Sequence, residues 1–272
     1  MNPEKFQPER LKGEQEKERF EPQIIFDFIR HGQTEYSNEL KTKMEQLGYK
    51  WEELMPTSKT TEEKIGTPAD LEGRLTAEGK AQLKEAAGIL VEKIDKDREN
   101  IMVLFGPRFR TIDSSKIILE ELERKNVDVR KARQHRDLID MQKHWIAILE
   151  FVKKKAPDTD KPISYWLNMS EQEIQEADLE EMGDIKKRMD HFIRLIKRYA
   201  QMFSNQLELD NKRLRVIAIT HDINILSILK KEEITPEDAV FIKNAQIVEL
   251  GINKEGKSKL LINEDKKTHD DL

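Results

Sequence analysis

The stretch that decides the fold is Ile24–Thr34, IIFDFIRHGQT, in which an apolar run ends abruptly in polar residues. The apolar part, Ile24–Ile29, is predicted to be a strand. Three more short apolar runs are predicted to be strands in the same way. They are Ile101–Phe105 (IMVLF), Val216–Thr220 (VIAIT) and Ile247–Leu250 (IVEL). The second and third of the four are apolar almost throughout, which is typical of strands covered on both faces of a sheet.

Long helical patterns separate these strands. Thr76 to about Lys96 and Asp184 to about Phe203 both carry apolar residues at helical spacing, and the second forms one continuous stripe. Ser170 with Glu173 makes a capping box, and Thr235–Glu237 is predicted to open a further helix. Strands that alternate with helices predict a three-layer α/β/α sandwich around a mostly parallel central sheet.

Two segments, at about 38–70 and 131–184, do not fit this alternation of strands and helices. They are predicted to be helical insertions over the carboxyl edge of the sheet. Asn38–Met55 has apolar residues spaced 4, 3, 4 and 3 apart, which predicts one amphipathic helix. The second insertion carries Trp145 and Trp166. We place one domain at 23–253, between a charged, disordered tail at 1–22 and a C-terminal strand or tail at 254–272.

The amino-acid composition excludes several classes of function. A chain of 272 residues can bury one core and a small cap. Its 48 basic residues are interspersed with 53 acids, for a net charge of -5, which argues against a nucleic-acid-binding face. The absence of cysteine excludes disulfides, thiolate metal sites and a cysteine nucleophile. With no secretory signal and no apolar run of about 18 residues, we expect a soluble, cytoplasmic protein without membrane contact.

Polar residues follow three of the predicted strands. Arg30-His31-Gly32-Gln33-Thr34 follows the first, Gly106-Pro107-Arg108-Phe109-Arg110-Thr111 the second, and His221-Asp222-Ile223-Asn224 the third. In open α/β sheets, ligands bind beyond the carboxyl ends of the strands. Two histidines and two or three arginines are therefore predicted to converge on one edge of the sheet.

This combination suits phosphate ester chemistry. Arginine guanidinium groups match the geometry of phosphoryl oxygens and stabilise the charge that develops on them, with no metal required. A neutral imidazole can attack phosphorus and form a phosphohistidine, which divides one difficult step into two easier ones. Gly32 allows the backbone to approach the phosphate closely. One further acid has to protonate the leaving alkoxide.

Five segments, in order, resemble the histidine phosphatase superfamily, which includes the phosphoglycerate mutases. Arg30–Thr34 matches its RHGxT signature, Leu75–Gln82 (LTAEGKAQ) its LTxxGxxQ segment, and Gly106–Thr111 its SPxxRA segment. Thr220-His221 and Asn244-Ala245 match two late steps of the pattern. The resemblance spans about residues 24 to 250 and implies a phosphoglycerate mutase-like fold with helical cap insertions.

The resemblance also implies roles for individual residues. His31 would be the nucleophile, with Arg30, Arg110 and His221 around the phosphoryl oxygens and Thr34 as a further donor. Of Arg110 and its neighbour Arg108, Arg108 is expected to be the more solvated. Ser37 and Asn38 stand where many members have one asparagine, and Gly106 replaces a common serine.

The general acid has two candidates. One branch of the family places a glutamate where this chain has Asp140, and another uses the aspartate of an HD pair, here His221-Asp222. The strand end fixes the position of Asp222, which favours it slightly, whereas aspartate at 140 is one methylene shorter than glutamate. Both alternatives remain open at the level of sequence.

The resemblance implies a metal-independent phosphomonoesterase that acts on a small phosphate ester or phosphorylated substrate, with no cofactor. The remaining histidines, His135, His144, His191 and His269, lack metal-ligand spacing and are expected at the surface. Two alternatives are a phosphoglycerate mutase-type phosphotransferase and a catalytically weak, phosphate-binding scaffold of the same fold. The sequence does not identify the substrate or the oligomeric state.

Overall fold

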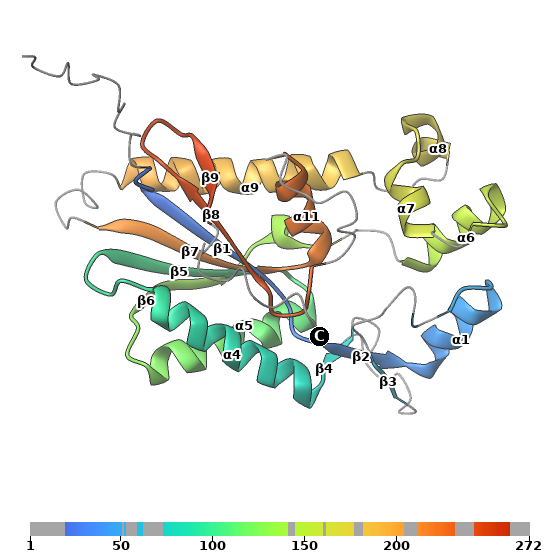
Figure 1. Cartoon of the computed structure of the whole chain (residues 1–272), viewed down its shortest axis with the longest axis horizontal. Coiled ribbons are helices and arrows are strands. Elements are labelled where there is room, and N and C mark those ends of the chain that lie inside the picture. The colour runs from blue at the N-terminus through green and yellow to red at the C-terminus, as the bar shows by residue number, and fades with distance from the viewer. Residues whose placement is uncertain are drawn as a thin grey trace, which may run out of the picture.

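The computed structural model describes residues 20–50, 52, 59–61, 73–140, 145–159, 162–176, 182–203, 212–231 and 242–261. In these residues a six-stranded sheet has the order β6-β5-β7-β1-β8-β9 (Figure 1). Its strands are β1 (Ile24–Arg30), β5 (Glu99–Phe105), β6 (Val129–Gln134), β7 (Arg213–Thr220), β8 (Ile247–Ile252) and β9 (Ser258–Leu260). The first four of that order are parallel, and β8 and β9 are antiparallel additions at one side. The predicted, mostly parallel sheet is confirmed.

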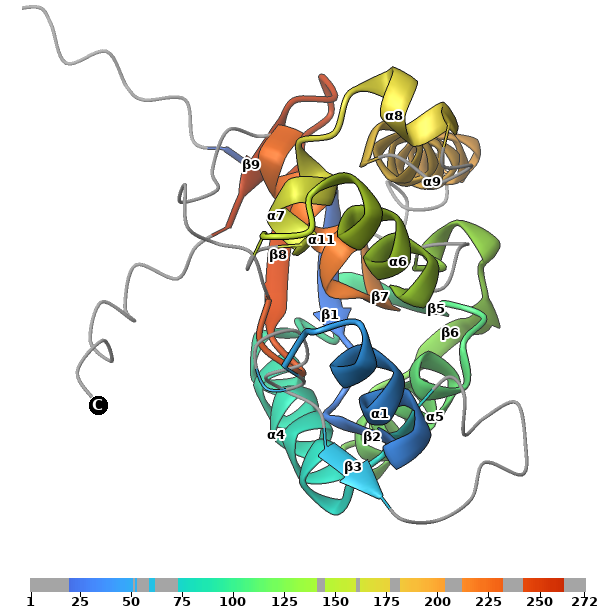
Figure 2. The ribbon, with the colours of Figure 1, turned by 90° about the vertical axis from the view of Figure 1, so that its right-hand side faces the viewer.

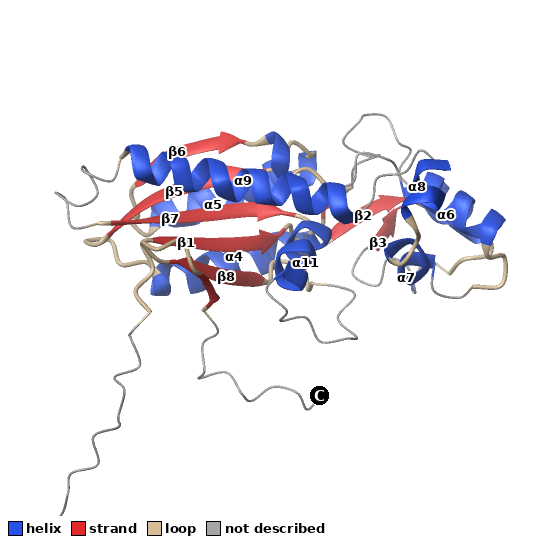
Figure 3. Ribbon diagram, turned by 90° about the horizontal axis from the view of Figure 1, so that it is seen from above, coloured by secondary structure: helices blue, strands red, loops and turns tan. Residues whose placement is uncertain are grey.

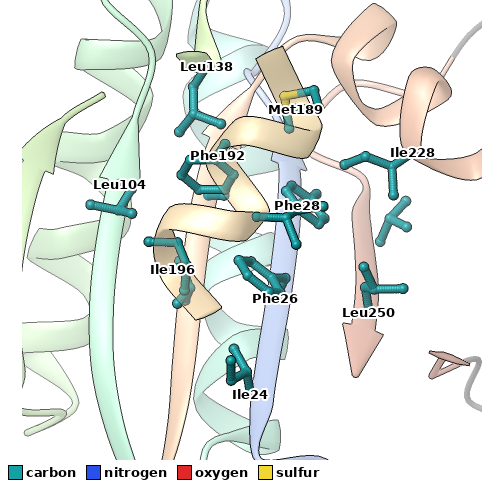
Figure 4. Close-up of a cluster of buried hydrophobic side chains, with 14 of the residues drawn as sticks. Ile24, Phe26, Phe28, Leu104, Leu138, Met189, Phe192, Ile196, Ile228 and Leu250 are labelled. Atoms are coloured by element: carbon teal, nitrogen blue, oxygen red, sulfur yellow. The ribbon is translucent and has the colours of Figure 1, made fainter. Parts of the chain in front are cut away.

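Helices cover both faces of the sheet, as Figures 1 and 2 show. One face carries α4 (Ala77–Lys93) and α5 (Phe109–Arg124), and the other carries α9 (Met182–Met202) and α11 (Asp222–Lys231). Strand β1 supplies side chains to both layers. Phe26 and Phe28 stack at 5.4 Å between ring centroids and meet Phe192 of α9 edge-on (Figure 4). Ile29 packs on the opposite face with the apolar side chains of α4 and α5.

The predicted second insertion starts too early, because residues 131–134 belong to β6 of the central sheet. The remaining inserted segments lie beyond the carboxyl ends of the parallel strands (Figure 3). They contain α1 (Asn38–Gln46), α6 (Trp145–Lys155), α7 (Pro162–Leu167) and α8 (Glu171–Glu176), which we call the cap, and a small sheet of β2 (Thr34–Ser37), β3 (Lys59–Thr61) and β4 (Arg74–Leu75). Buried side chains of α6 and α7 pack against Ile185 of α9 and Ile223 of α11. This apolar cluster joins the cap to the sandwich.

The first insertion departs from the predicted single helix over Asn38–Met55. Helix α1 ends at Gln46, because Gly48 has φ +86° and its backbone N–H closes the helix on the Glu45 carbonyl. A left-handed residue of this kind ends a helix even where the apolar spacing continues. The capping box on α8 is confirmed, since Ser170 and Glu173 bond each other reciprocally. The 1–19 part of the predicted tail and the predicted helix at Thr235 lie outside the described residues. No helix in the described part of the chain has the length and apolar character to cross a membrane.

A charge network is buried under α4, toward the amino ends of the parallel strands. Arg215 on β7 bonds Asp27 on β1 at 2.8 Å and Glu99 on β5 at 2.6 Å, and lies 3.1 Å from Glu249 on β8. Arg215 and Asp27 are almost fully buried. Burial raises the pKa of Asp27 to about 7, although the positive charge of Arg215 opposes the shift. Asp27 therefore holds a proton in the folded state at pH values where the unfolded chain has released it.

This shift predicts how stability depends on pH. Between pH 4 and 7 the folded state binds more protons at Asp27 than the unfolded state, so this carboxyl contributes stability at low pH that is lost as the pH rises toward 7. The Asp27→Asn variant does not lose this contribution. As the pH rises from 5 to 7, its unfolding free energy should therefore increase by about 2 kcal/mol relative to that of wild type. Urea denaturation at the two pH values measures it. Exposed Asp97→Asn is the control, and parallel pH dependence of wild type and Asp27→Asn would contradict the prediction.

Candidate active site

The carboxyl ends of β1, β5 and β7 are neighbours, so the residues that follow them meet. In the parallel register, Arg30 pairs with Thr220 and Phe105 with Ile219. His31 and His221 consequently face each other, with ring centroids 5.2 Å apart and a 65° angle between the rings. Arg110, in the first turn of α5, donates from Nε to His221 Nδ1 at 3.4 Å. The structure therefore brings together His31, His221 and Arg110, and all three side chains are buried.

Hydrogen bonds assign different tautomers to the two imidazoles. His31 Nδ1 lies 2.8 Å from the Gly32 carbonyl oxygen, which can only accept, so Nδ1 carries the proton and Nε2 presents a lone pair. His221 Nδ1 accepts from Arg110 Nε, which can only donate, so its proton is on Nε2. That buried Nε2 has no hydrogen-bond partner in the described residues. One ring thus offers a nucleophilic nitrogen and the other an unused donor.

The surroundings hold both imidazoles neutral. Burial and the charges of Arg110 and Arg30 lower the pKa of His31 well below its usual value, and the neighbouring His221 adds to the effect. Burial lowers the pKa of His221 in the same way, with Arg110, Arg108 and Arg30 as the nearby positive charges. At neutral pH the His31 ring is therefore neutral, with no proton on Nε2, and this is the form that can attack phosphorus.

Arg30 is the last residue of β1, and its side chain reaches the start of α11. Its Nη1 donates to the carbonyl oxygen of Ile242, and its Nη2 forms a 3.5 Å ion pair with Asp222. Asp222 begins α11, and its other carboxylate oxygen accepts from the Ile223 backbone N–H at 2.9 Å. The predicted candidate Asp222 therefore lies beside Arg30 and also accepts from a backbone N–H in the first turn of its own helix.

Asp140 reaches the site from the loop after β6. Its carboxylate binds Arg108 Nε at 2.9 Å through one oxygen and Arg110 Nη2 through the other, and the second oxygen is 3.8 Å from His221 Nδ1. Arg108 is the more solvated of the two arginines, as predicted, with its side chain 26% exposed against 9% for Arg110, and the Asp140 carboxylate holds it at the edge of the site. Both candidate acids thus contact an arginine of the site.

Gly106 has a steric role next to this loop. A Cβ at position 106 would lie 2.5 Å from the carbonyl oxygen of Leu138, which is closer than any side chain allows. Thr220 Oγ1 donates to the same carbonyl at 3.0 Å, and Asn224 Nδ2 donates to the Ile139 carbonyl at 2.8 Å. Glycine in place of the common serine therefore lets the Asp140 loop pack directly on the end of β5.

The segment matching LTxxGxxQ, Leu75–Gln82, holds the loop after His31 in place. Thr76 caps α4 by accepting from the Gly79 N–H at 2.9 Å, and its hydroxyl donates to the Gln33 side-chain oxygen. Gln82 accepts from the Gln33 N–H at 3.1 Å. The two backbones touch here, since a Cβ on Gly32 would lie 2.4 Å from the Gly79 carbonyl oxygen and a Cβ on Gly79 would lie 2.2 Å from the Gln33 carbonyl oxygen. Helix α4 thus fixes the residues directly after His31.

This contact predicts the effect of Gly79→Ala. The added methyl has to push the Gln33 backbone away, and His31 moves with it. Displacement of a reacting group by about 1 Å can lower turnover on the order of 100-fold, and overpacking costs about 1–3 kcal/mol of stability. Gly88→Ala on the same helix is the control, because a Cβ there meets nothing within 4 Å. Equal turnover and thermal stability for the two variants would contradict the steric role.

The other predicted residues lie at the start of the first insertion. Thr34 is buried at the beginning of β2, where it pairs with Leu75. Ser37 ends β2 and Asn38 begins α1, and the orientation of their side chains lies outside what the structure describes. Among the described residues, no group of three or more His, Asp or Glu side chains is arranged to hold a metal ion.

Sequence reasoning missed several residues that shape the site. Ser114 of α5 accepts from the Gly32 N–H at 3.4 Å, and its hydroxyl donates to the Arg110 carbonyl at 2.6 Å. Arg188 of α9 donates to the backbone of the Asp140 loop. Ser114 follows Arg110 by one helical turn, and this spacing was a usable signal. Arg188 is remote in sequence and has no local pattern that would reveal it.

No protein-family model matches the sequence, and no curated protein is significantly similar to it. Solved structures nevertheless share its fold. Phosphoglycerate mutase from Bacillus anthracis str. Sterne is 13% identical, with a TM-score of 0.54 over 87% of this chain and 91% of that chain. A mycobacterial glucosyl-3-phosphoglycerate phosphatase in complex with VO3 is 14% identical, with a TM-score of 0.50 over 88% and 97%. Mycobacterial hydrolase 2 is 14% identical, with a TM-score of 0.51 over 88% and 89%. The predicted phosphoglycerate mutase-like α/β fold is therefore confirmed.

Proposed function

We propose that this phosphoglycerate mutase-like chain is a phosphomonoesterase that transfers the phosphoryl group of an ester to His31 Nε2 and then to water. The single observation that carries the proposal is the pair of imidazoles with opposite tautomers. His31 presents a lone pair and His221 presents an unpaired N–H, and both lie beside Arg110 in a buried site. A tetrahedral dianion fits this set, because it needs one attacking nitrogen and several donors.

In the first step, His31 Nε2 attacks phosphorus and the P–N bond forms as the ester P–O bond breaks. Arg30, Arg110 and the Nε2–H of His221 stabilise the charge on the three peripheral oxygens. The His31 Nδ1–H bond to the Gly32 carbonyl keeps the ring oriented and supports the positive charge that the imidazole acquires. A carboxylic acid donates its proton to the leaving alkoxide.

In the second step, water attacks phosphorus from the side that the alcohol left. The carboxylate formed in the first step takes one proton from this water, the P–N bond breaks, and inorganic phosphate leaves with His31 neutral again. The acid has therefore regained its proton, and the enzyme is unchanged over the cycle. The low pKa of His31 ensures that the neutral nucleophile is ready at neutral pH.

The geometry favours Asp140 over Asp222 as this acid. Asp140 contacts Arg110 and lies within 3.8 Å of His221, so it borders the phosphoryl site from the loop side. A bound dianion competes with the Asp140 carboxylate for Arg110, which places the carboxylate next to the substrate. Asp222 instead pairs with Arg30 at 3.5 Å and accepts from the Ile223 backbone N–H of its own helix. Its role in the proposal is to orient Arg30.

Phosphoglycerate mutase is one of the proteins with this fold, so transfer to a second alcohol is an alternative fate of the same phosphohistidine. A scaffold that binds phosphate without turnover is the other alternative. Substrates in all these proposals are small phosphate esters or phosphorylated molecules. The glucosyl-3-phosphoglycerate phosphatase of the same fold makes phosphoglycerate derivatives reasonable members of a substrate panel.

Covalent trapping tests the proposal. Protein mixed with a radiolabelled aryl phosphate and quenched in alkali should retain label on His31, because phosphohistidine survives base and is hydrolysed by acid. Digestion and mass analysis locate the label. Label lost to water indicates a phosphatase, and label lost only to an added phosphoglycerate indicates a mutase. Binding of inorganic phosphate with no label on His31 for any ester in the panel would overturn the proposal.

A further inference from the structure

The loop that carries Asp140 is attached to helix α9. Residues 135–140 leave β6 through a short 3₁₀ turn, Arg136–Leu138, and continue to Asp140. Arg188 Nη2 donates to the Asp140 carbonyl at 2.9 Å and to the Ile139 carbonyl at 3.4 Å. Nearly one turn later on the same helix, His191 Nδ1 lies 2.6 Å from a carboxylate oxygen of buried Asp137. One face of α9 therefore holds this loop at two points.

The Arg188 contacts are made to the backbone, which leaves the Asp140 carboxylate for other partners. That carboxylate binds Arg108 and Arg110, the arginines at the edge of the sheet. Arg188 is half-buried, and its charge also interacts favourably with Asp140 and Asp137. A charged donor to a backbone carbonyl makes a strong, directional hydrogen bond. Arg188 is thus placed to set where the Asp140 carboxylate lies.

Helix α9 is also fixed to the cap. Ile185, one turn before Arg188, is buried in the apolar cluster with Ile148 of α6 and Trp166 of α7. Phe192, one turn after Arg188, is buried in the core against β1. The segment from 185 to 192 therefore runs from the cap to the core and contacts the Asp140 loop midway.

We propose that Arg188 is a positioning residue that holds the Asp140 loop on α9 and so places the Asp140 carboxylate beside Arg110 and His221. The inference rests on the proposed function in so far as Asp140 is the acid. Arg188 acts through the loop backbone and contacts no substrate. Through Ile185, the same helix makes the position of the acid dependent on the packing of the cap.

The expected effect is partial, because three other residues hold the same loop, one of them His191 through its 2.6 Å contact with Asp137. Thr220 donates to the Leu138 carbonyl and Asn224 to the Ile139 carbonyl, and both bonds persist without Arg188. Arg188→Lys keeps the positive charge and loses the guanidinium geometry. It should lower kcat for a simple alkyl phosphate about 10- to 100-fold, as expected for a small misplacement of a catalytic group, with little change in KM.

Comparing substrates isolates the acid. An aryl phosphate such as para-nitrophenyl phosphate has a good leaving group that needs little protonation, so its turnover should fall much less than that of the alkyl ester. Arg188→Lys should also lose nothing further in an Asp140→Asn background, because its effect passes through Asp140. Arg194→Met, an exposed position on the same helix, is the matched control and should behave as wild type. A loss in the double variant equal to the product of the two single losses would overturn the proposal.

Hydrogen exchange tests the attachment without any activity. The backbone amides of residues 135–140 should exchange faster in Arg188→Lys and Arg188→Met than in wild type or Arg194→Met, with unchanged exchange in the core strands. Unchanged exchange in this loop would overturn the proposal whatever the kinetics. If wild type turns over no ester and the loop still loosens, then the proposed function fails while the structural role of Arg188 stands.

Discussion

Replacement of His31 with alanine should abolish phosphate ester hydrolysis, with kcat falling by at least about 10⁴-fold, as expected when a nucleophile is lost. His31 is the only group in the proposal that forms a bond to phosphorus. Its Nε2 lone pair is oriented by the bond from Nδ1 to the Gly32 carbonyl, and burial keeps the ring neutral. Alanine removes the attacking atom and leaves the arginines in place. Steady-state rates with an aryl phosphate measure the loss.

Binding provides the control for this variant. Arg30, Arg110 and His221 remain in His31→Ala, so calorimetry should still detect inorganic phosphate or vanadate at an affinity within about tenfold of wild type, which corresponds to 1.4 kcal/mol. Retained binding with lost turnover assigns the defect to chemistry. Loss of binding as well would indicate that the site has collapsed.

A second variant distinguishes a nucleophile from a structural histidine. His31→Gly leaves a hollow the size of an imidazole ring, and added imidazole should restore part of the turnover by attacking phosphorus in place of the side chain. Rescue should rise with imidazole concentration and be absent in wild type. Equal rates of ester hydrolysis by wild type and His31→Ala would contradict the proposed mechanism, because no bond to phosphorus would then depend on this residue.

The main part of the site could be predicted from sequence for a simple physical reason. Buried parallel strands align at their carboxyl ends, so the residues after β1, β5 and β7 have to meet whatever the connecting helices do. The apolar runs that identify those strands are strong signals because both of their faces are covered. His31, Arg110 and His221 were therefore found together from three segments that are remote in sequence.

Edge strands and helix ends were harder to predict from the sequence. Strand β6 is an edge strand with a largely exposed, basic sequence, VRKARQ, so it lacks the apolar run that identified the other parallel strands. Helix α1 ends early because Gly48 adopts a left-handed conformation, and the apolar spacing beyond it carries no sign of that. Periodicity reports which face is apolar and not where the backbone turns away.

The partners of Arg108 and Asp140 were beyond sequence reasoning for another reason. Their contact depends on the path of a loop, and the loop depends on tertiary bonds to Thr220, Asn224 and Arg188. No local pattern encodes such a path. The sequence shows that Gly106 departs from the family pattern but not why. The structure gives the reason, because a Cβ at this position would lie 2.5 Å from the Leu138 carbonyl oxygen.

Asparagine at position 140 should have the second largest effect, and it should depend on the leaving group. Asp140→Asn is nearly isosteric and cannot donate a proton as an acid, so kcat for an alkyl phosphate should fall about 10²- to 10⁴-fold. For an aryl phosphate with a good leaving group, phosphorylation of His31 needs little help, and the initial burst of product should persist. Rapid-quench measurements with the two substrates separate the burst from steady-state turnover.

Asp222→Asn is the matched comparison, since it makes the same chemical change at the other candidate acid. Asp222 pairs with Arg30 at 3.5 Å, so its loss should weaken phosphate binding and affect alkyl and aryl esters alike. The ratio of alkyl to aryl turnover therefore identifies the acid, because of these two carboxylates only the proton donor should change it. A ratio that collapses in Asp222→Asn and is unchanged in Asp140→Asn would move the acid to the N-terminus of α11. In that case the ion pairs of Asp140 would serve to orient Arg108 and Arg110, and Arg188 would position those arginines rather than a proton donor.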